Sequence, residues 1–380
     1  MGVRIVISST IRRCTAAALV AVLAGPGATI IAEPVAGIVY LDANADGNRD
    51  PGEKGLAGVG VTDGRAFAET DAAGRYALDA RTDRLMPTGA RPIVRVTCPT
   101  GHWPTAPWFV RLEDAADTAA VDFGLRIDEQ PLPFTFVHGT DPHVPRGGRH
   151  VFPAFRRDVA ALDPKPRFCI LTGDLVNLSD RQGPETARAD FAFLARGMKG
   201  FPVPLFCLPG NHDVAGVQLP PSLRAKWAKS PEGRYYGLYR KTVGPLRWSF
   251  NYGGVHFVGL DFNEHDGKAW RWRPPAHAVA WLKADLDRVP KGAEVLLFVH
   301  YPGGQRALGP VVRDRNIRHI FAGHSHSQGP MKTTAGTAIA GGAIAPGGSK
   351  APAPSGFHLV TVSEKAVTYK YLPINLDAKP

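Results

Sequence analysis

Cysteine is scarce in this chain, with four residues in 380, and only three of these lie beyond residue 32. An odd number this small excludes a disulfide-stapled scaffold. Beyond the N-terminal segment, no apolar run reaches the roughly 18 residues that a membrane-spanning helix needs. Hydrophobic residues make up 44% of the chain and charged residues 21%, which indicates a globular protein of two or three domains. The 42 glycines and 34 prolines favour turns and short strands over long helices.

Acidic residues are absent before Glu33, and this N-terminal stretch carries three arginines. An Ala/Val/Leu-rich run over residues 15–24 follows the arginines, residues 25–27 break it, and Ala32 is a small residue suited to cleavage. This order is typical of a secretory signal peptide. We therefore predict a signal peptide over residues 1–32 and a periplasmic or secreted protein. The alternative, an uncleaved membrane anchor, fits less well because the apolar run is short for a span.

The chain is basic, with a formal net charge of +11. Removing residues 1–32 takes away three arginines and no acid, so the charge falls to +8. A basic surface suits acidic partners such as small phosphorylated molecules, anionic polymers or lipid headgroups. No basic run interleaved with aromatic residues accompanies it, so the sequence has no clear nucleic-acid-binding motif.

Short runs of strand-forming residues, separated by turn clusters, occupy residues 33–127. They include residues 37–41, 59–61, 75–78 and 93–96. No segment in this region has a helical period. Short strands punctuated by turns predict a small all-β sandwich domain.

An oxygen-rich loop follows the first predicted strand of this sandwich. Side-chain oxygens stand at positions 1, 3, 5, 9 and 12 of the loop and glycine at position 6, which is the spacing of a calcium loop. The residues that would bind one Ca²⁺ are Asp42, Asn44, Asp46, Asp50 and Glu53. The flanking strands exclude a helix–loop–helix site, and an Asx turn without an ion is the alternative. The segment resembles the loop that opens prealbumin-like or Cna-B-like modules of bacterial surface proteins, which implies an anchor or spacer.

From about residue 132 the pattern changes to strand, loop and helix, and each apolar strand ends in a polar cluster. The clusters are Asp141-Pro-His143, Gly173-Asp174, Gly210-Asn211-His212-Asp213, His300 and Gly323-His324-Ser325-His326. Ligand sites of α/β sheets lie at such strand ends. Imidazole and carboxylate groups without thiolate suit Mn, Fe, Zn or Ni rather than a structural zinc site. The candidate metal ligands are Asp141, His143, Asp174, Asn211, His300, His324 and His326.

In this order the five clusters resemble those of the calcineurin-like metallophosphoesterase family. The resemblance extends from about residue 134 to 330 and includes the hairpin pattern over residues 246–261. It implies a four-layered α/β sandwich of two mixed sheets flanked by helices, over residues 128–380, that holds two divalent metals. By similarity, the first metal is held by Asp141, His143 and His326, the second by Asn211, His300 and His324, and Asp174 bridges them.

The resemblance also implies catalytic roles for His212 and Asp213. His212 would stand opposite the nucleophile, stabilise charge and protonate the leaving oxygen, with Asp213 as its orienting partner. The position three residues after the bridging aspartate is often acidic in relatives, but here it is Asn177. His212 therefore lacks an acidic partner at this position of the sequence pattern.

We expect an exported, binuclear-metal-dependent phosphoesterase that hydrolyses phosphomonoesters or phosphodiesters with a metal-activated water. Its substrate would be a nucleotide, a lipid headgroup, a wall polymer or another organic phosphate. Two alternatives are a catalytically inactive cell-surface binding or adhesion protein, which the complete ligand set disfavours, and an exported nuclease, which would need basic surface beside the site. A Trp-rich loop within residues 263–275 could clamp a substrate, but a solvated surface loop is the simpler interpretation.

Overall fold

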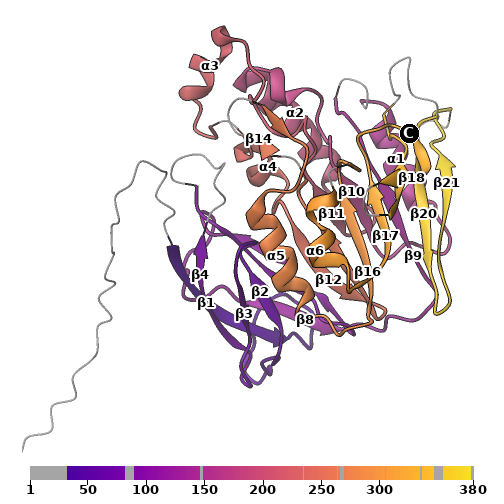
Figure 1. The fold of residues 1–380 in the computed structure, drawn as a ribbon. Coiled ribbons are helices and arrows are strands. Elements are labelled where there is room, and N and C mark those ends of the chain that lie inside the picture. Colours follow the sequence, from indigo (N-terminus) through magenta and orange to yellow (C-terminus); the bar gives the residue numbers. More distant parts are fainter. Residues whose placement is uncertain are drawn as a thin grey trace, which may run out of the picture.

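The computed structural model describes residues 32–81, 90–145, 149–233, 235–262, 264–265, 269–303, 305–333, 336–345 and 354–377. The signal peptide predicted over residues 1–32 lies outside the described residues, apart from Ala32. Figure 1 shows two parts: a small part built of strands and a larger part in which strands and helices alternate. Within the described ranges, no helix combines the length and the apolar character needed to cross a bilayer.

In the described ranges, the small part contains eight strands arranged as two four-stranded sheets. One sheet has the order β4-β1-β8-β6 and the other β3-β2-β5-β7. Strand β4 alternates exposed and buried residues along its whole length, so one of its faces points into a core, as in a sandwich. The strands are β1 (Ala32–Leu41), β2 (Gly60–Thr62), β3 (Phe67–Glu69), β4 (Arg75–Arg81), β5 (Ile93–Thr97), β6 (His102–Pro104), β7 (Phe109–Arg111) and β8 (Phe123–Ile127).

The large part begins with a five-stranded sheet of order β11-β10-β9-β20-β21. The first three strands are parallel, and the last two continue the sheet in antiparallel fashion. Helices α1 and α2 follow β9 and β10 along the chain, as the alternation of the sequence predicted. The elements are β9 (Phe134–Gly139), α1 (Val151–Ala160), β10 (Cys169–Thr172), α2 (Pro184–Met198), β11 (Leu205–Leu208), β20 (Gly356–Val362) and β21 (Val367–Pro373).

A six-stranded mixed sheet of order β12-β13-β16-β17-β19-β18 completes the large part. Its strands are β12 (Trp248–Tyr252), β13 (Val255–Gly259), β16 (Glu294–Val299), β17 (Asn316–Ala322), β18 (Gln328–Thr333) and β19 (Gly336–Gly341). The remaining elements are η1 (Ser179–Arg181), α3 (Pro221–Ala228), α4 (Gly237–Thr242), β14 (Glu264–His265), β15 (Trp270–Arg271), α5 (Ala276–Leu286), η2 (Gln305–Ala307) and α6 (Gly309–Val312).

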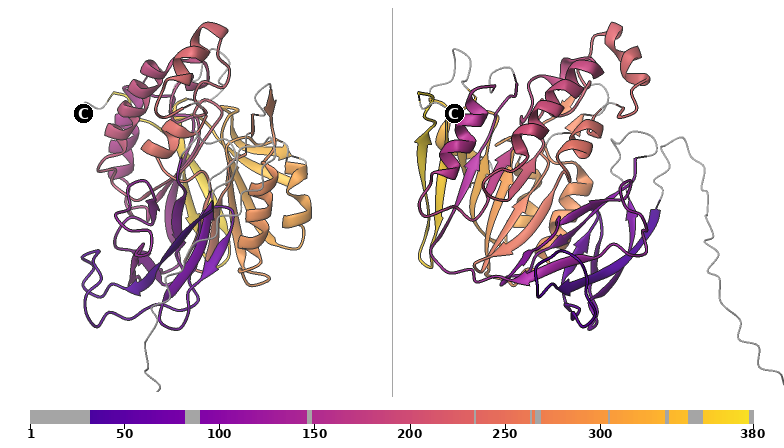
Figure 2. Two further views of the ribbon diagram at one scale, coloured as in Figure 1. Left: turned by 90° about the vertical axis from the view of Figure 1, so that its left-hand side faces the viewer. Right: turned by 180° about the vertical axis from the view of Figure 1, so that it is seen from behind.

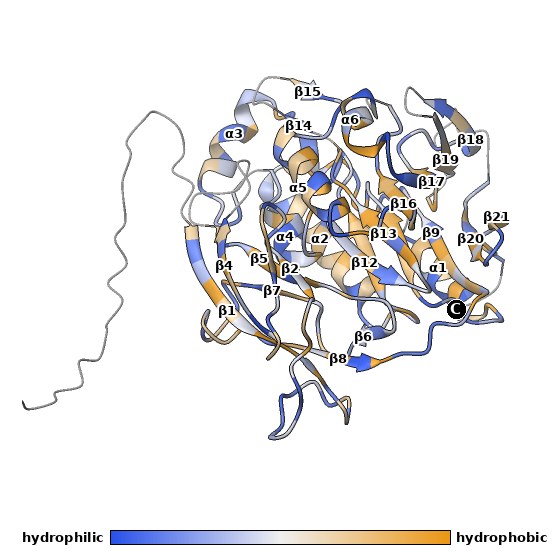
Figure 3. Cartoon of the chain, turned by 60° about the horizontal axis from the view of Figure 1, so that its bottom comes forward, coloured by the Kyte–Doolittle hydropathy of each residue, from blue (hydrophilic) through white to orange (hydrophobic). Residues whose placement is uncertain are grey.

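The two large sheets pack face to face through aromatic rings. The ring of Phe136 lies 5.5 Å from Phe257 and 5.9 Å from Phe298, and Phe168 lies 5.2 Å from Phe257. Figure 3 shows how strongly apolar β9, β13 and β16 are, as strands buried on both faces must be. Each fully buried phenylalanine contributes about 1.5–3 kcal/mol.

Helices cover the outer face of each large sheet. Residues of α1 and α2 share a core cluster with β9–β11, and residues of α5 share one with β13, β16 and β17. The left view of Figure 2 shows these helices on opposite sides, with the two sheets between them. The four-layered sandwich predicted from the sequence, preceded by an all-β region, is therefore confirmed.

The small sandwich packs against the N-terminal ends of the five-stranded sheet. The indole of Trp103 in β6 lies 6.0 Å from the rings of both Phe168 and Phe206, which stand at the start of β10 and β11. Phe67 of β3 in the small sandwich also stacks on Trp281 of α5, the helix that covers the six-stranded sheet, at 5.8 Å. We keep the proposed division of the chain into residues 33–127 and 128–380, although the two parts share a continuous apolar contact.

A buried guanidinium also joins the two parts. Arg247, 1% exposed, donates to both carboxylate oxygens of Asp261 at 2.6 and 3.0 Å, and to the backbone carbonyl of Gly64 at 2.6 Å. Gly64 belongs to the turn between β2 and β3, whereas Arg247 immediately precedes β12. The ion pair with Asp261 fixes the guanidinium within the large part, and its hydrogen bond to Gly64 crosses to the sandwich. A hydrogen bond to a charged group typically contributes about 1.5–3 kcal/mol.

Candidate metal centre

All seven candidate ligands follow the carboxyl ends of strands. Two come after β9, one each after β10, β11 and β16, and two after β17. Strands β9, β10 and β11 are neighbours in one sheet, and β16 and β17 are neighbours in the other. Because the two sheets are stacked, these strand ends meet at one edge of the sandwich, opposite the small domain. This is where parallel α/β sheets place their sites.

Five of the ligands adopt a backbone conformation that side-chain-bearing residues rarely take. Their φ angles lie between 44° and 67°, in the left-handed region, which turns each side chain sharply away from the line of its strand. Such conformations cost about 1–3 kcal/mol each and cluster at functional sites. The residues are Asp141, His143, Asp174, His324 and His326.

Two glycines allow the loops of the centre to approach one another. A Cβ on Gly210 would lie 2.2 Å from Oδ1 of Asp174, and a Cβ on Gly173 would lie 2.7 Å from Nδ1 of His300. Any side chain at either position would push a candidate ligand out of place. The glycines of the Gly-Asp and Gly-Asn-His-Asp clusters are therefore required by close packing.

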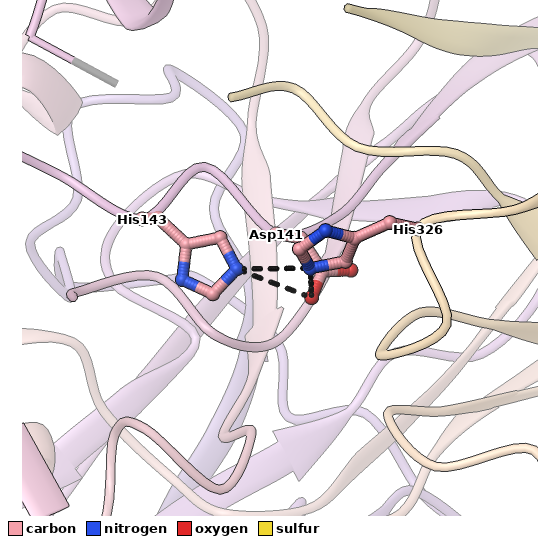
Figure 4. A group of neighbouring side chains, drawn as sticks. All are labelled: Asp141, His143 and His326. Carbon is pink, nitrogen blue, oxygen red and sulfur yellow. Dashed lines mark hydrogen bonds and ion pairs between the residues drawn. The ribbon is translucent and has the colours of Figure 1, made fainter. Parts of the chain in front are cut away.

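The first group of ligands consists of Asp141, His143 and His326 (Figure 4). The two Nε2 atoms face each other at 3.1 Å, and they lie 3.6 Å (His143) and 3.3 Å (His326) from Oδ1 of Asp141. This oxygen is buried and has no hydrogen bond of good geometry within the described ranges. A divalent cation would satisfy all three atoms at once, so the residues fit a metal.

The second group consists of Asp174, His300 and His324, with Asn211 beside them. Nε2 of His300 lies 3.4 Å from Oδ2 of Asp174, and the Asn211 amide oxygen lies 3.2 Å from His300 and 2.9 Å from His324. Nδ1 of His300 donates to the backbone carbonyl of Thr172 at 2.7 Å. That bond leaves Nε2 as the atom that can bind a metal.

The charges of the centre are strongly coupled. Burial alone would raise the pKa of the Asp174 carboxyl, but the positive charge of His300 holds it well below its usual range. Burial opposes protonation of His300, yet the Asp174 carboxylate raises the pKa of His300 to about 9. Burial and the charge of His300 together lower the pKa of His324 to about 4. Buried carboxylates thus draw in positive charge, which metal ions supply.

His212 stands beside this centre but outside both groups. Its Nδ1 lies 2.8 Å from a carboxylate oxygen of Asp180, which is completely buried, and its Nε2 lies 3.9 Å from Oδ2 of Asp174. Burial would lower the pKa of His212, but the Asp174 and Asp180 carboxylates outweigh burial and raise it. The ring is therefore held on its Nδ1 side and directs Nε2 toward the metal ligands.

Asp213 does not orient His212. Its carboxylate accepts backbone N–H groups from Gly210 at 2.8 Å, Val176 at 3.0 Å and Leu175 at 3.1 Å, and so ties together the loops after β10 and β11. The role suggested for Asp213 from the sequence is corrected, because Asp180 performs it.

Asp180 was missed because it lies six residues beyond Asp174, outside the spacing that the family pattern suggests. Leu178, with φ at 59°, starts the short helix η1 that returns Asp180 to the centre. An acidic residue in a short turn after the Gly-Asp cluster is the signal that could have found it.

The loop predicted to bind calcium is closed by its own hydrogen bonds. Asp42 is buried and accepts the N–H of Gly47 at 2.8 Å, and Asn44 donates to Asp50 at 2.9 Å. The Glu53 carboxylate accepts backbone N–H groups from Ala43 and Asp50. Among the described residues, only the two groups at the strand ends gather three metal-ligating side chains around one point. The calcium assignment stays a prediction.

Taken together, a four-layered sandwich and paired imidazole–carboxylate groups at its strand ends define an α/β protein built to hold metal ions. The sequence profile of the calcineurin-like phosphoesterase family matches residues 134–328, slightly more than half of the chain. The chain belongs to this family. The match begins at β9 and ends after the last histidine of the centre, so it spans every candidate ligand.

Known proteins resemble the chain at low identity. The serine/threonine-protein phosphatase CPPED1 of Bos taurus is 23% identical over 235 residues, which are 51% of this chain and 69% of that protein. The structure of purple acid phosphatase PPD1 from yellow lupin seeds gives a TM-score of 0.41 at 12% identity, covering 90% of this chain and 67% of that one. The NAD nucleotidase NadN of Haemophilus influenzae gives 0.36 at 14% identity, covering 64% and 50%.

Replacing Asp174 tests the centre directly. We expect Asp174→Asn to bind less metal and to lose at least about 100-fold in turnover, because a neutral amide there removes the charge that both cations need. The measurement is metal content by mass spectrometry alongside phosphoester hydrolysis. Asp287→Asn, on the exposed end of α5, should change neither. Near-normal turnover with a full complement of metal in Asp174→Asn would disprove the assignment.

Proposed function

We propose that this protein is a two-metal hydrolase of small phosphomonoesters or phosphodiesters. The convergence of Asp141, His143 and His326 with Asp174, His300 and His324 at one sheet edge is the observation that carries this proposal. Two divalent cations bound there would polarise the phosphoryl oxygens and supply an activated water. The donor set suits Mn, Fe, Zn or Ni.

His212 is the general acid of the proposed reaction. Nδ1 is held by Asp180, and Nε2 points toward the centre, where it can deliver a proton to the oxygen that leaves phosphorus. The two carboxylates that raise the pKa of His212 favour its protonated form. Asp180 is a positioning residue, because it acts on the reaction only through the His212 ring.

An active enzyme fits the site better than the alternatives. A binding protein that had lost catalysis would commonly have lost a ligand, whereas all seven candidate ligands are present here. A nuclease would need basic side chains beside the centre, and the sequence supplies no nucleic-acid motif to favour it. Nucleotides, lipid headgroups, wall polymers and other organic phosphates remain the proposed substrates.

We also propose that the enzyme acts outside the cytoplasm. The basic, apolar and small-residue order before Glu33 supports removal of a signal peptide. N-terminal sequencing of extracytoplasmic protein should start near Glu33. An intact Met1 in that fraction would contradict the proposal.

The small sandwich is proposed to be a prealbumin-like or Cna-B-like module that binds one Ca²⁺. The loop spacing and the buried Asp42, one of whose oxygens lacks a hydrogen bond of good geometry within the described part of the chain, support it. Binding to the folded state alone adds about 2.7 kcal/mol at a hundred times Kd. Calcium should therefore raise the Tm of the full chain and of Asp174→Asn, but not of Asp42→Asn. An equal shift in Asp42→Asn would argue against this site.

The hydrolytic role of His212 can be tested by varying the leaving group. General acid catalysis contributes about 10²- to 10⁴-fold, so His212→Asn should lose most with alkyl phosphates and least with 4-nitrophenyl phosphate, whose phenolate leaves without a proton. The measurement is kcat/KM against leaving-group pKa, for wild type and variant, with each candidate metal.

Three controls accompany this series. Metal content should be unchanged in His212→Asn, since His212 belongs to neither ligand group. Asp180→Asn should show a weaker form of the same dependence, because the ring keeps its chemistry but loses its orientation. An equal loss for every leaving group would assign His212 to electrostatic stabilisation instead of proton donation.

A further inference from the structure

An aromatic cluster lies directly against the metal ligand His324. The rings of Tyr301 and Trp272 lie 5.0 and 5.2 Å from the His324 imidazole, and 4.9 Å from each other. Trp270 stacks on Trp272 at 5.5 Å with an angle of 28° between the rings. These residues come from the loop around β15 and from the residue that follows His300, so two separate loops build the cluster.

The cluster is built into the fold. A Cβ on Gly303 would lie 2.6 Å from the Tyr301 ring, so this ring rests on bare backbone that only glycine provides. On the other side, the buried His265 meets Trp270 edge-on at 5.2 Å, and Trp270 packs against the core of the five-stranded sheet. The interpretation of this segment as a solvated surface loop therefore does not hold for Trp270, whereas Trp272 is exposed to solvent.

Trp272 is a member of this ring cluster and is also exposed to solvent. Its side chain is 36% exposed, and it is one of only four large apolar residues in the described ranges with that much exposure. The other three are Ile127, Leu132 and Leu376. An exposed aromatic ring beside a candidate reaction centre is typical of a binding site.

We propose that Trp272, supported by Trp270 and Tyr301, binds a planar aromatic ring in the alcohol part of the substrate. A further ring would continue the existing stack, and offset stacking on indole favours flat π-systems over saturated groups. The proposal rests on the proposed phosphoesterase function. It narrows the substrates to phosphoesters of alcohols that carry an aryl group or a nucleobase.

The position of the cluster determines which part of the substrate meets it. In hydrolysis the P–O bond to the alcohol breaks, the oxygen of water bonds to phosphorus, and the alcohol departs with a proton. His324 would bind a metal that contacts the phosphate, so a ring bound on Trp272 lies next to the phosphate and belongs to the departing alcohol. Trp272 therefore contributes to substrate affinity and takes no part in the bond-breaking step.

Benzyl phosphate and cyclohexylmethyl phosphate form a matched pair of substrates, because both release a primary alcohol of similar size and only one is aromatic. The wild-type enzyme should prefer benzyl phosphate by about five- to tenfold in kcat/KM, mainly through KM, as expected for one aromatic stacking contact. Trp272→Ala should abolish the preference, and Trp272→Phe should retain part of it. Arg273→Ala, an exposed neighbour outside the ring cluster, should leave it unchanged.

A second pair identifies the source of the ring. Adenosine 5′-monophosphate and ribose 5-phosphate both release a primary alcohol, but only the first carries a nucleobase. A larger Trp272 effect here than with the benzyl pair would assign the site to nucleotides, and a smaller one to aryl esters. Benzylphosphonate, which cannot be hydrolysed, should quench tryptophan fluorescence in the wild type and less in Trp272→Ala.

The outcomes separate this inference from the function on which it rests. If wild type hydrolyses neither member of a pair nor 4-nitrophenyl phosphate with any candidate metal, the proposed function fails. If it hydrolyses both members equally well, the function stands and the aromatic site is disproved. An equal loss for both members in Trp272→Ala, or a loss of bound metal, would show that Trp272 merely supports His324.

Discussion

The centre depends on one constraint: Asp141 and Asp174 are buried where the ends of two sheets meet, and their charge must be balanced. Each lies in a left-handed turn just beyond its strand, held there by packing that glycine permits. The imidazoles gather around these two carboxylates, and the pKa of His300 rises in response to Asp174. The stacked sheets supply a rigid frame. Because an aromatic core fixes the strand ends, the Asp141 and Asp174 carboxylates stay close together despite their like charges.

Much of this arrangement could be predicted from the sequence because strand ends are visible there. Apolar runs followed by Asp, Asn or His located the ligands, and the family resemblance carried by the order of the clusters implied the four layers. Asp180 could not be located in this way. It lies 32 residues from His212, and their contact depends on how the turn through Leu178 folds back. Asp213 was assigned by proximity in sequence, but its oxygens are already occupied by three backbone amides.

The aromatic cluster is another set of contacts that could not be predicted from the sequence. Trp272 and His324 are 52 residues apart, and no periodicity links a loop near β15 to the end of β17. The sequence shows that this loop is rich in tryptophan. Which of the rings faces the centre depends on how the two-stranded hairpin of β14 and β15 packs against the rest of the domain. Tertiary packing decides such contacts. Short loops between strands have no hydrophobic periodicity from which this packing could be inferred.

The attachment of the small sandwich has a geometric consequence. Trp103 contacts the start of β10 and β11, and Arg247 donates a hydrogen bond to the turn at Gly64. The candidate ligands follow the opposite ends of β10 and β11. A domain fixed in this way cannot act as a swinging tether. The sandwich and the metal centre therefore lie at opposite ends of the same strands, and a molecule bound on the far side of the sandwich would be separated from the centre by the full length of these strands.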